Sequence, residues 1–188
     1  MLRINIYDFA IYVDSQTLHR TKLSSSLRRP LWRWHRGSRT PTELFQQVVT
    51  NHDVEMSLTV RPSRDLPLVL MASEYKRILR KRMKVLGGNP NDEALTTLLQ
   101  YFDADKLPPK ATRRGCIRKD TTLHFCRTKN GVLTAVANGT LLTSVHSRKL
   151  CEAVFDLYLG DAPVSKKARA TAGQTMLEMI TNPPVAQA

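Results

Sequence analysis

The spacing of apolar residues predicts strands at the start and in the middle of the chain. From Leu2 to Val13 the residues alternate so that both faces of an extended chain are largely apolar. Such a strand belongs in the interior of a sheet, and Asp14 and Ser15 end it. A second strand is predicted from Val54 to Arg61, where every other residue is apolar.

Three shorter strands follow in the second half of the sequence, over Leu123 to Arg127, Val132 to Ala137 and Leu141 to Val145. The first two are joined by Asn130-Gly131 and the last two by Asn138-Gly139. Asn-Gly favours a tight hairpin because type I′ turns need positive φ at both central residues. The sequence therefore predicts a three-stranded antiparallel meander.

Apolar residues at helical spacing predict helices between and after these strands. The expected helices run from the capping box at residues 40–43 to His52, from Met71 to Leu86, from Asp92 to Tyr101, through Leu150 to Tyr158, and onward from Ser165. This order predicts the α+β class, with one antiparallel sheet packed on one face by helices in a single domain over residues 1–188. Residues 16–38, rich in Ser and Arg, are expected to form an irregular basic insertion.

Cysteine usage argues against a disulfide framework or a zinc site. Cys116, Cys126 and Cys151 include no C-x-x-C pair. His124 and Cys126 lie two residues apart and share a strand face, but no second pair completes a metal site. We therefore expect neither a metal nor a cofactor, and no apolar stretch is long enough to cross a bilayer.

The formal charge of +13 and the pI near 10.1 raise the question of a polyanionic partner. The basic residues concentrate in segments 20–39, 76–84 and 110–129, none of which has a recognisable nucleic-acid-binding motif. No specific nucleic-acid partner is predicted. An alternative is a protein that binds nucleic acid or a membrane surface non-specifically through Lys76 to Lys84.

The helix predicted from Met71 to Leu86 carries the most informative residues. Its apolar stripe includes a charged residue, Arg82, and Tyr75 lies two turns earlier on the same face, about 10 Å away along the axis. Burying a guanidinium without a partner is costly, so we expect Arg82 to meet a carboxylate. That carboxylate could belong to a ligand, or to Glu152 or Asp156 of the chain itself.

Two stretches resemble the chalcone-isomerase family, and most closely its fatty-acid-binding branch. The first is Leu86-Gly87-Gly88 followed by Asn91-Asp92-Glu93, with Tyr101-Phe102 running to Pro108-Pro109. The second and stronger is Val145 to Arg169, which contains Phe155-Asp156-Leu157-Tyr158-Leu159-Gly160. The resemblance implies an open-faced β-sandwich, with a ligand cleft between a large antiparallel sheet and its helices. It also implies that the first strand of the fold is truncated here.

The resemblance also implies which cleft residues have changed. The true isomerases close a chalcone to a flavanone with an Arg from a strand that precedes the one opening this chain. Their cleft Tyr matches Tyr75, but an Asn becomes Arg82, a Thr becomes Tyr7, and a Ser or Thr of the late helix becomes Glu152. These replacements argue against flavonoid cyclisation, so no catalytic residue is predicted. An isomerase of the chalcone type remains the alternative.

We therefore expect a non-catalytic protein that binds a fatty acid or a similar lipophilic anion. Arg82 and Tyr75 are predicted to form the polar end of the site, and the apolar wall is predicted to comprise Tyr7, Phe9, Leu79 and Phe155. A plastid location is expected, with the targeting segment outside this chain. The sequence predicts no oligomeric state.

Overall fold

A computed structural model describes residues 6–20, 42–103 and 106–181 of the chain. The strands are β1 (Tyr7–Val13), β2 (Met56–Pro62), β3 (Leu66–Pro67), β4 (Thr112–Arg113), β5 (Cys116–Ile117), β6 (Leu123–Thr128), β7 (Val132–Ala137) and β8 (Thr140–His146). The helices are α1 (Ser15–Arg20), α3 (Thr42–Thr50), α4 (Leu68–Val85), α5 (Glu93–Gln100), α6 (Arg148–Leu159) and α7 (Lys166–Thr181). None of the described helices is both long and apolar enough to cross a membrane.

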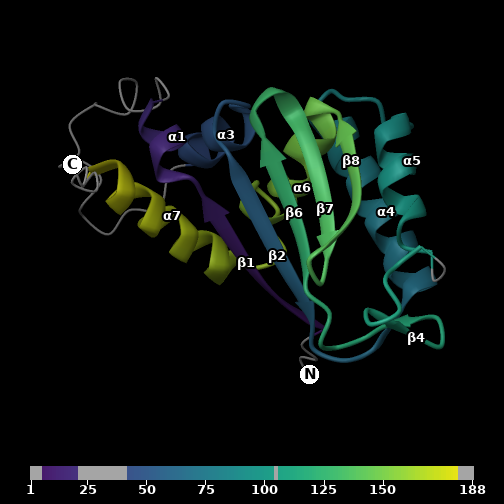
Figure 1. The fold of residues 1–188 in the computed structure, drawn as a ribbon. Coiled ribbons are helices and arrows are strands. Elements are labelled where there is room, and N and C mark those ends of the chain that lie inside the picture. Colours follow the sequence, from purple (N-terminus) through teal and green to yellow (C-terminus); the bar gives the residue numbers. More distant parts are fainter. Residues whose placement is uncertain (1–5, 21–41, 104–105, 182–188) are drawn as a thin grey trace.

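The larger sheet has five antiparallel strands in the order β1-β2-β6-β7-β8. Helices α4, α5 and α6 lie together behind one face of it, and α7 runs beside β1 (Figure 1). This arrangement confirms the predicted α+β class with helices on one side of an open antiparallel sheet.

The meander forms with the predicted turn chemistry. Asn130 and Gly131 have φ values of 70° and 76°, and Asn138 and Gly139 have φ values of 47° and 81°. Ala137 pairs with Thr140 across a two-residue turn, as predicted, whereas Thr128 pairs with Val132, so the first connection has three residues, Lys129–Gly131. Asn and Gly adopt the positive φ of both connections at low cost. The β6-β7-β8 meander is therefore specified locally, before any tertiary contact.

Strand β1 departs from its predicted position. Among the described residues it pairs only with β2 and forms an edge of the large sheet, so the expectation of an interior strand was wrong. One face of β1 packs on the core, but Tyr12 on the other face is exposed. The apolar residues on both faces misled the prediction because an aromatic side chain can also lie on a solvent-facing sheet surface.

The predicted irregular insertion is only partly described. Residues Ser15–Arg20 form helix α1, where Asp14 accepts a hydrogen bond from the backbone N–H of Thr17 at 2.6 Å. The start of the insertion is thus helical, whereas residues 21–38 and the first half of the capping box at 40–43 lie outside the described residues.

Helix α6 is the centre of the helical layer. Nine of its twelve residues are buried, and it packs against α3, α4 and α7. Ser147 caps its N-terminus by accepting a hydrogen bond from the N–H of Leu150, and it donates one to Asp92 at 2.7 Å. The cap therefore ties the start of α6 to the start of α5.

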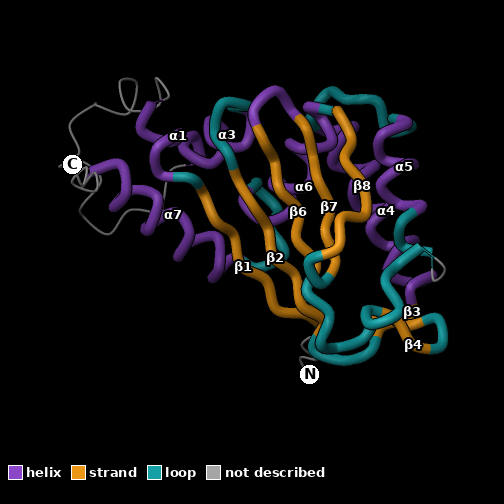
Figure 2. The backbone as a smooth tube through the Cα atoms, in the orientation of Figure 1, coloured by secondary structure: helices purple, strands orange, loops and turns teal. Residues whose placement is uncertain are grey.

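A second sheet, which the sequence analysis did not predict, has the strand order β3-β5-β4. It lies at the start of α4, where the N–H of Leu68 donates to the carbonyl of Gly115 at 3.0 Å (Figure 2). Each of its strands has only two residues, which is too short for an alternating pattern to identify.

Candidate functional site

The main cavity of the described structure has a volume of about 400 Å³ and lies between the large sheet, α4 and the end of α6. Apolar side chains form most of its wall: Val60, Leu66, Met71, Ile78, Leu123 and Leu157. Tyr7, Tyr75, Arg64 and Glu74 add polar groups to the lining. A largely apolar cavity with a few polar groups is typical of a site for a small lipophilic molecule.

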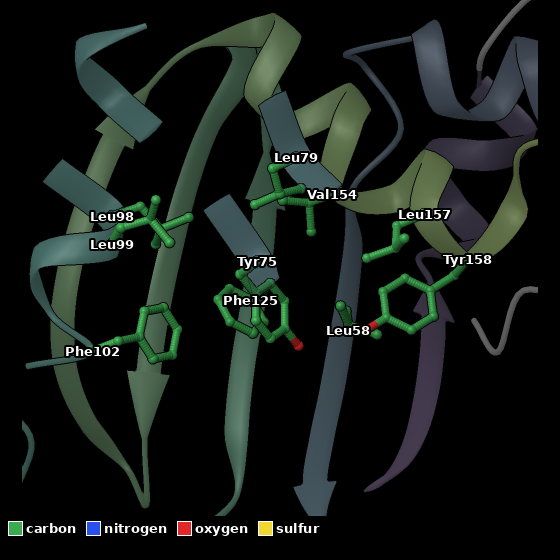
Figure 3. Close-up of a pocket in the computed structure, with 10 residues that line it drawn as sticks. All are labelled: Leu58, Tyr75, Leu79, Leu98, Leu99, Phe102, Phe125, Val154, Leu157 and Tyr158. Carbon is green, nitrogen blue, oxygen red and sulfur yellow. The ribbon is translucent and has the colours of Figure 1, made fainter. Parts of the chain in front are cut away.

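A much smaller cavity of about 10 Å³ lies deeper between the sheet and helices α4, α5 and α6. Figure 3 shows its ten lining residues, of which Tyr75 and Leu157 also line the main cavity. The Tyr75 ring stacks on Phe102 with centroids 6.0 Å apart and planes 9° apart. Tyr75, held by Phe102, and Leu157 therefore separate the two spaces.

Three tyrosines from three different elements gather at this boundary: Tyr7 of β1, Tyr75 of α4 and Tyr158 of α6. Tyr158 is only 1% exposed, and its hydroxyl has no hydrogen-bond partner of regular geometry in the described part of the chain. Figure 3 shows its ring reaching from α6 toward Leu58 of the sheet. The Tyr7 and Tyr75 hydroxyls reach it only in irregular geometry, so the Tyr158 hydroxyl is available to a ligand group that can accept a hydrogen bond.

Burial keeps these three tyrosines in the phenol form. It raises the pKa of Tyr75 to about 12, raises that of Tyr158 well above the ordinary value, and raises that of Tyr7 as well. The Tyr7 and Tyr75 hydroxyls lie close enough to that of Tyr158 to affect its pKa. At neutral pH the boundary thus offers neutral O–H donors, which suit a carboxylate or carbonyl oxygen.

Arg82 takes a place other than the predicted one. Its Nη1 donates to the Asp156 carboxylate at 2.7 Å, its Nη2 donates to the carbonyl of Ala162, and both charged side chains are 16% exposed. Arg82 lines neither cavity. The geometry therefore does not support a ligand head group on this residue, and the alternative pairing with Asp156 is confirmed.

The Arg82–Asp156 pair connects α4 to α6. Burial raises the pKa of Asp156, and the adjacent Arg82 opposes that shift. A half-buried carboxylate needs such a partner to stay charged. The pair therefore helps to fix the distance between the two helices that border the cavity.

Residues 1–172 match the family described as "Chalcone isomerase like". The chain belongs to this chalcone isomerase-like family. Its fold is similar to that of a crystal structure of an Arabidopsis thaliana fatty-acid binding protein, with a TM-score of 0.73, 19% identity, and 95% of this chain and 82% of the other covered.

Curated relatives include fatty-acid-binding proteins. Fatty-acid-binding protein 1 of Arabidopsis thaliana is 24% identical over 168 residues, which cover 88% of this chain and 55% of the relative. Fatty-acid-binding protein 2 of the same plant is 37% identical over 106 residues, covering 56% and 24%. Chalcone isomerase-like protein 1 of Humulus lupulus is 24% identical over 180 residues, covering 94% and 76%. The chain thus spans about half of the first relative and a quarter of the second.

The remaining predicted wall residues of this chalcone isomerase-like domain lie in different places. Leu79 lines only the small cavity, and Phe9 and Phe155 line neither. Phe9 instead packs against the Tyr158 ring, with the two ring centroids 4.7 Å apart. Phe155 packs against Arg127, whose Cζ lies 5.4 Å from the centroid of the Phe155 ring. Of the six predicted site residues, the structure brings Tyr7 and Tyr75 to the main cavity.

Arg127 is a buried residue that the sequence analysis missed. It is 1% exposed and donates hydrogen bonds to the backbone carbonyls of Val48, Val49, Asn51 and Val54 at 2.6 to 3.2 Å. Burial lowers its pKa to about 10, so it stays charged at neutral pH. The strand alternation Leu123, Phe125, Arg127 pointed it inward, and this pattern could have identified it.

Glu152 lines neither cavity and pairs with two basic side chains. Its two carboxylate oxygens contact His52 Nε2 at 3.1 Å and Lys149 Nζ at 2.7 Å. His124, half of the suspected metal pair, lies 2.9 Å from the Thr59 hydroxyl. Within the described ranges, no three His, Cys, Asp or Glu residues are grouped closely enough to hold a metal ion.

Proposed function

We propose that this chain binds a fatty acid or a similar lipophilic carboxylate without transforming it. The observation that carries the proposal is an apolar cavity of about 400 Å³ beside a buried tyrosine cluster in which the Tyr158 hydroxyl has no hydrogen-bond partner of regular geometry. Its volume lies within the range of small-molecule sites, roughly 300–1,000 Å³. Two relatives with fatty-acid-binding names and the similarity of fold support it.

The acyl chain would lie against the apolar wall formed by residues such as Met71 and Ile78. The carboxylate would accept hydrogen bonds from the tyrosine hydroxyls, which remain protonated because burial raises their pKa values. Hydrogen bonds from neutral donors to a charged acceptor are stronger than those between two neutral groups. In this proposal Arg82 positions α4 through Asp156 and does not touch the ligand.

The test removes a single oxygen from the site. Tyr158→Phe should weaken the binding of hexadecanoate about five- to tenfold, because the carboxylate loses one donor. Isothermal titration calorimetry on the purified chain gives the affinity. Tyr12→Phe is the matched control, since Tyr12 is exposed on the opposite face of β1, and it should bind like the unmodified chain.

Two results would count against the proposal. If the unmodified chain takes up no fatty acid, the cavity does not serve this ligand. If Tyr158→Phe binds normally while Arg82→Met loses affinity, the head group belongs on Arg82 and not at the tyrosine cluster. Unfolding of Tyr158→Phe in urea should show a loss of at most about 1 kcal/mol, because the removed hydroxyl makes only irregular contacts with those of Tyr7 and Tyr75.

A further inference from the structure

The opening of the main cavity exposes large apolar side chains to solvent. Ile6, Leu70 and Val164 all line the cavity and are all among the exposed large hydrophobic residues of the described chain. Leu70 is 62% exposed, and its neighbour Val69, also in the first turn of α4, is 80% exposed. We call Ile6, Val69, Leu70 and Val164 the apolar mouth.

Basic residues are frequent in two chain segments next to this mouth. Segments 61–70 and 110–119, which carry the β3-β5-β4 sheet, contain one acidic residue, Asp65, and seven basic residues. We call these seven exposed residues the basic rim: Arg61, Arg64, Lys110, Arg113, Arg114, Arg118 and Lys119. In the described part of the chain none of them forms an ion pair.

The rim and the mouth belong to one surface. Arg64 of the rim and Leu66 and Pro67 of β3 line the cavity itself. Strand β3 pairs with β5, which pairs with β4, and Gly115 between β4 and β5 accepts a hydrogen bond from the N–H of Leu68, next to Val69. The small sheet thus lies beside the first turn of α4 (Figure 2), and Arg113 belongs to its strand β4.

We propose that the apolar mouth and basic rim dock the chain on an anionic lipid bilayer. Basic side chains near an anionic membrane gain about 1 kcal/mol each, and exposed apolar side chains at the same place can enter the headgroup boundary. A soluble polyanion would use the arginines but would leave Val69 and Leu70 in water. The combination of both surfaces around the cavity opening therefore favours a membrane.

This inference goes beyond the proposed ligand binding, although the two fit together. A lipophilic molecule that entered through a docked mouth would not have to cross bulk water. The inference also differs from a membrane contact through Lys76 to Lys84, because the basic rim lies at the opposite end of α4 from Lys84.

Co-sedimentation with vesicles tests the proposal. The chain should sediment with vesicles of phosphatidylcholine and phosphatidylglycerol, but not with phosphatidylcholine alone. Arg113→Glu/Arg118→Glu should weaken this binding at least tenfold, since two attractive charges become repulsive. Lys81→Glu/Lys84→Glu changes the net charge equally at exposed sites on α4, and it should retain most of the binding.

Val69→Ser separates a membrane from a soluble polyanion. Val69 lines neither cavity, and its replacement should weaken vesicle binding about threefold or more while leaving retention on heparin unchanged. The proposal is overturned if Val69→Ser binds vesicles normally, if the two charge-reversal variants lose binding equally, or if neutral vesicles bind as well. Hexadecanoate uptake from solution by the rim variants reports on ligand binding separately, so a failure of docking leaves that function standing.

Discussion

A single side chain, Arg127, organises the segment between α3 and β2. Its guanidinium meets carbonyls at the end of α3 and in the loop that follows, including those of Val49 and Val54. The last carbonyls of a helix have no partner within the helix, and a buried helix end needs an external donor. Arg127 supplies these donors from β6 and so fastens α3 to the large sheet.

Arg127→Leu should lower the free energy of unfolding by about 3 kcal/mol, because several buried carbonyls lose their donors. Urea unfolding followed by circular dichroism measures the change. Arg127→Lys retains the charge but not the planar set of donors, and it should give an intermediate loss. Equal stability of Arg127→Leu and the unmodified chain would show that these carbonyls find other partners.

His52 should make stability dependent on pH. Burial lowers its pKa below the ordinary 6.5, Arg127 and Arg148 lower it further, and the contact with Glu152 opposes them. Because the folded pKa is depressed, the associated stability is fully present above about pH 6.5 and is lost as the pH falls through the folded pKa. His52→Gln should therefore show a shallower loss of unfolding free energy between about pH 7 and pH 5. A slope identical to that of the unmodified chain would contradict this assignment.

The end of helix α6 depends on a glycine for steric reasons. Gly160 has an ordinary φ of −70°, but an added Cβ would overlap the Asp156 carboxylate and lie 2.6 Å from the Asp156 carbonyl oxygen. The carboxylate that pairs with Arg82 would have to move, which would loosen the link between α4 and α6.

Gly160→Ala should therefore reduce the unfolding free energy by about 2 kcal/mol. Gly139→Ala is a useful comparison, since nothing lies within 4 Å of its added Cβ but its φ is 81°. Its cost should come only from the left-handed backbone and amount to about 1 kcal/mol. Thermal or urea unfolding of both variants gives the difference. A Gly160→Ala variant no less stable than Gly139→Ala would show that Asp156 can move freely.

Elements with strong local signals were predictable from the sequence. The meander rested on Asn-Gly turns, and helix α4 was expected from Met71 to Leu86 and is observed from Leu68 to Val85. The helix starts three residues before its apolar stripe. Pro67 is its N-cap residue, a position that proline tolerates, so the helix can begin at Leu68. The two-residue strands and the edge position of β1 depend on long-range pairing, which no local pattern reveals.

The site was less predictable than the fold because side-chain partners are a property of tertiary packing. The helical stripe placed Tyr75 and Arg82 on one inward face, but it could not decide between a ligand, Glu152 and Asp156 as the partner of the Arg82 guanidinium. Tyr158 ends the helix expected through Leu150 to Tyr158, but only the assembled structure shows that its hydroxyl has no hydrogen-bond partner of regular geometry in the described part of the chain. A charged residue on an apolar stripe therefore predicts a partner but does not identify it.

At the scale of the whole molecule, the chain is an open sheet with its cavities on the helical side. The main cavity lies near the start of α4, and the small one extends from it toward α5. Leu157 contributes to the walls of both, and the Tyr75 ring, held by Phe102, completes the boundary. The depth available from the mouth is therefore set by two side chains and not by the backbone.

Those two side chains would limit how far the carboxylate end of the proposed ligand enters, and therefore how many methylenes of a long acyl chain are left outside the mouth. Leu157→Ala should join the small space to the main cavity. The binding free energy of hexadecanoate relative to dodecanoate should then improve by up to about 0.8 kcal/mol for each additional methylene that becomes buried. Competition calorimetry with the two acids measures the shift, and an unchanged ratio would show that the boundary does not limit the chain. Substitution at one buried position would then be enough to retune selectivity without altering the fold.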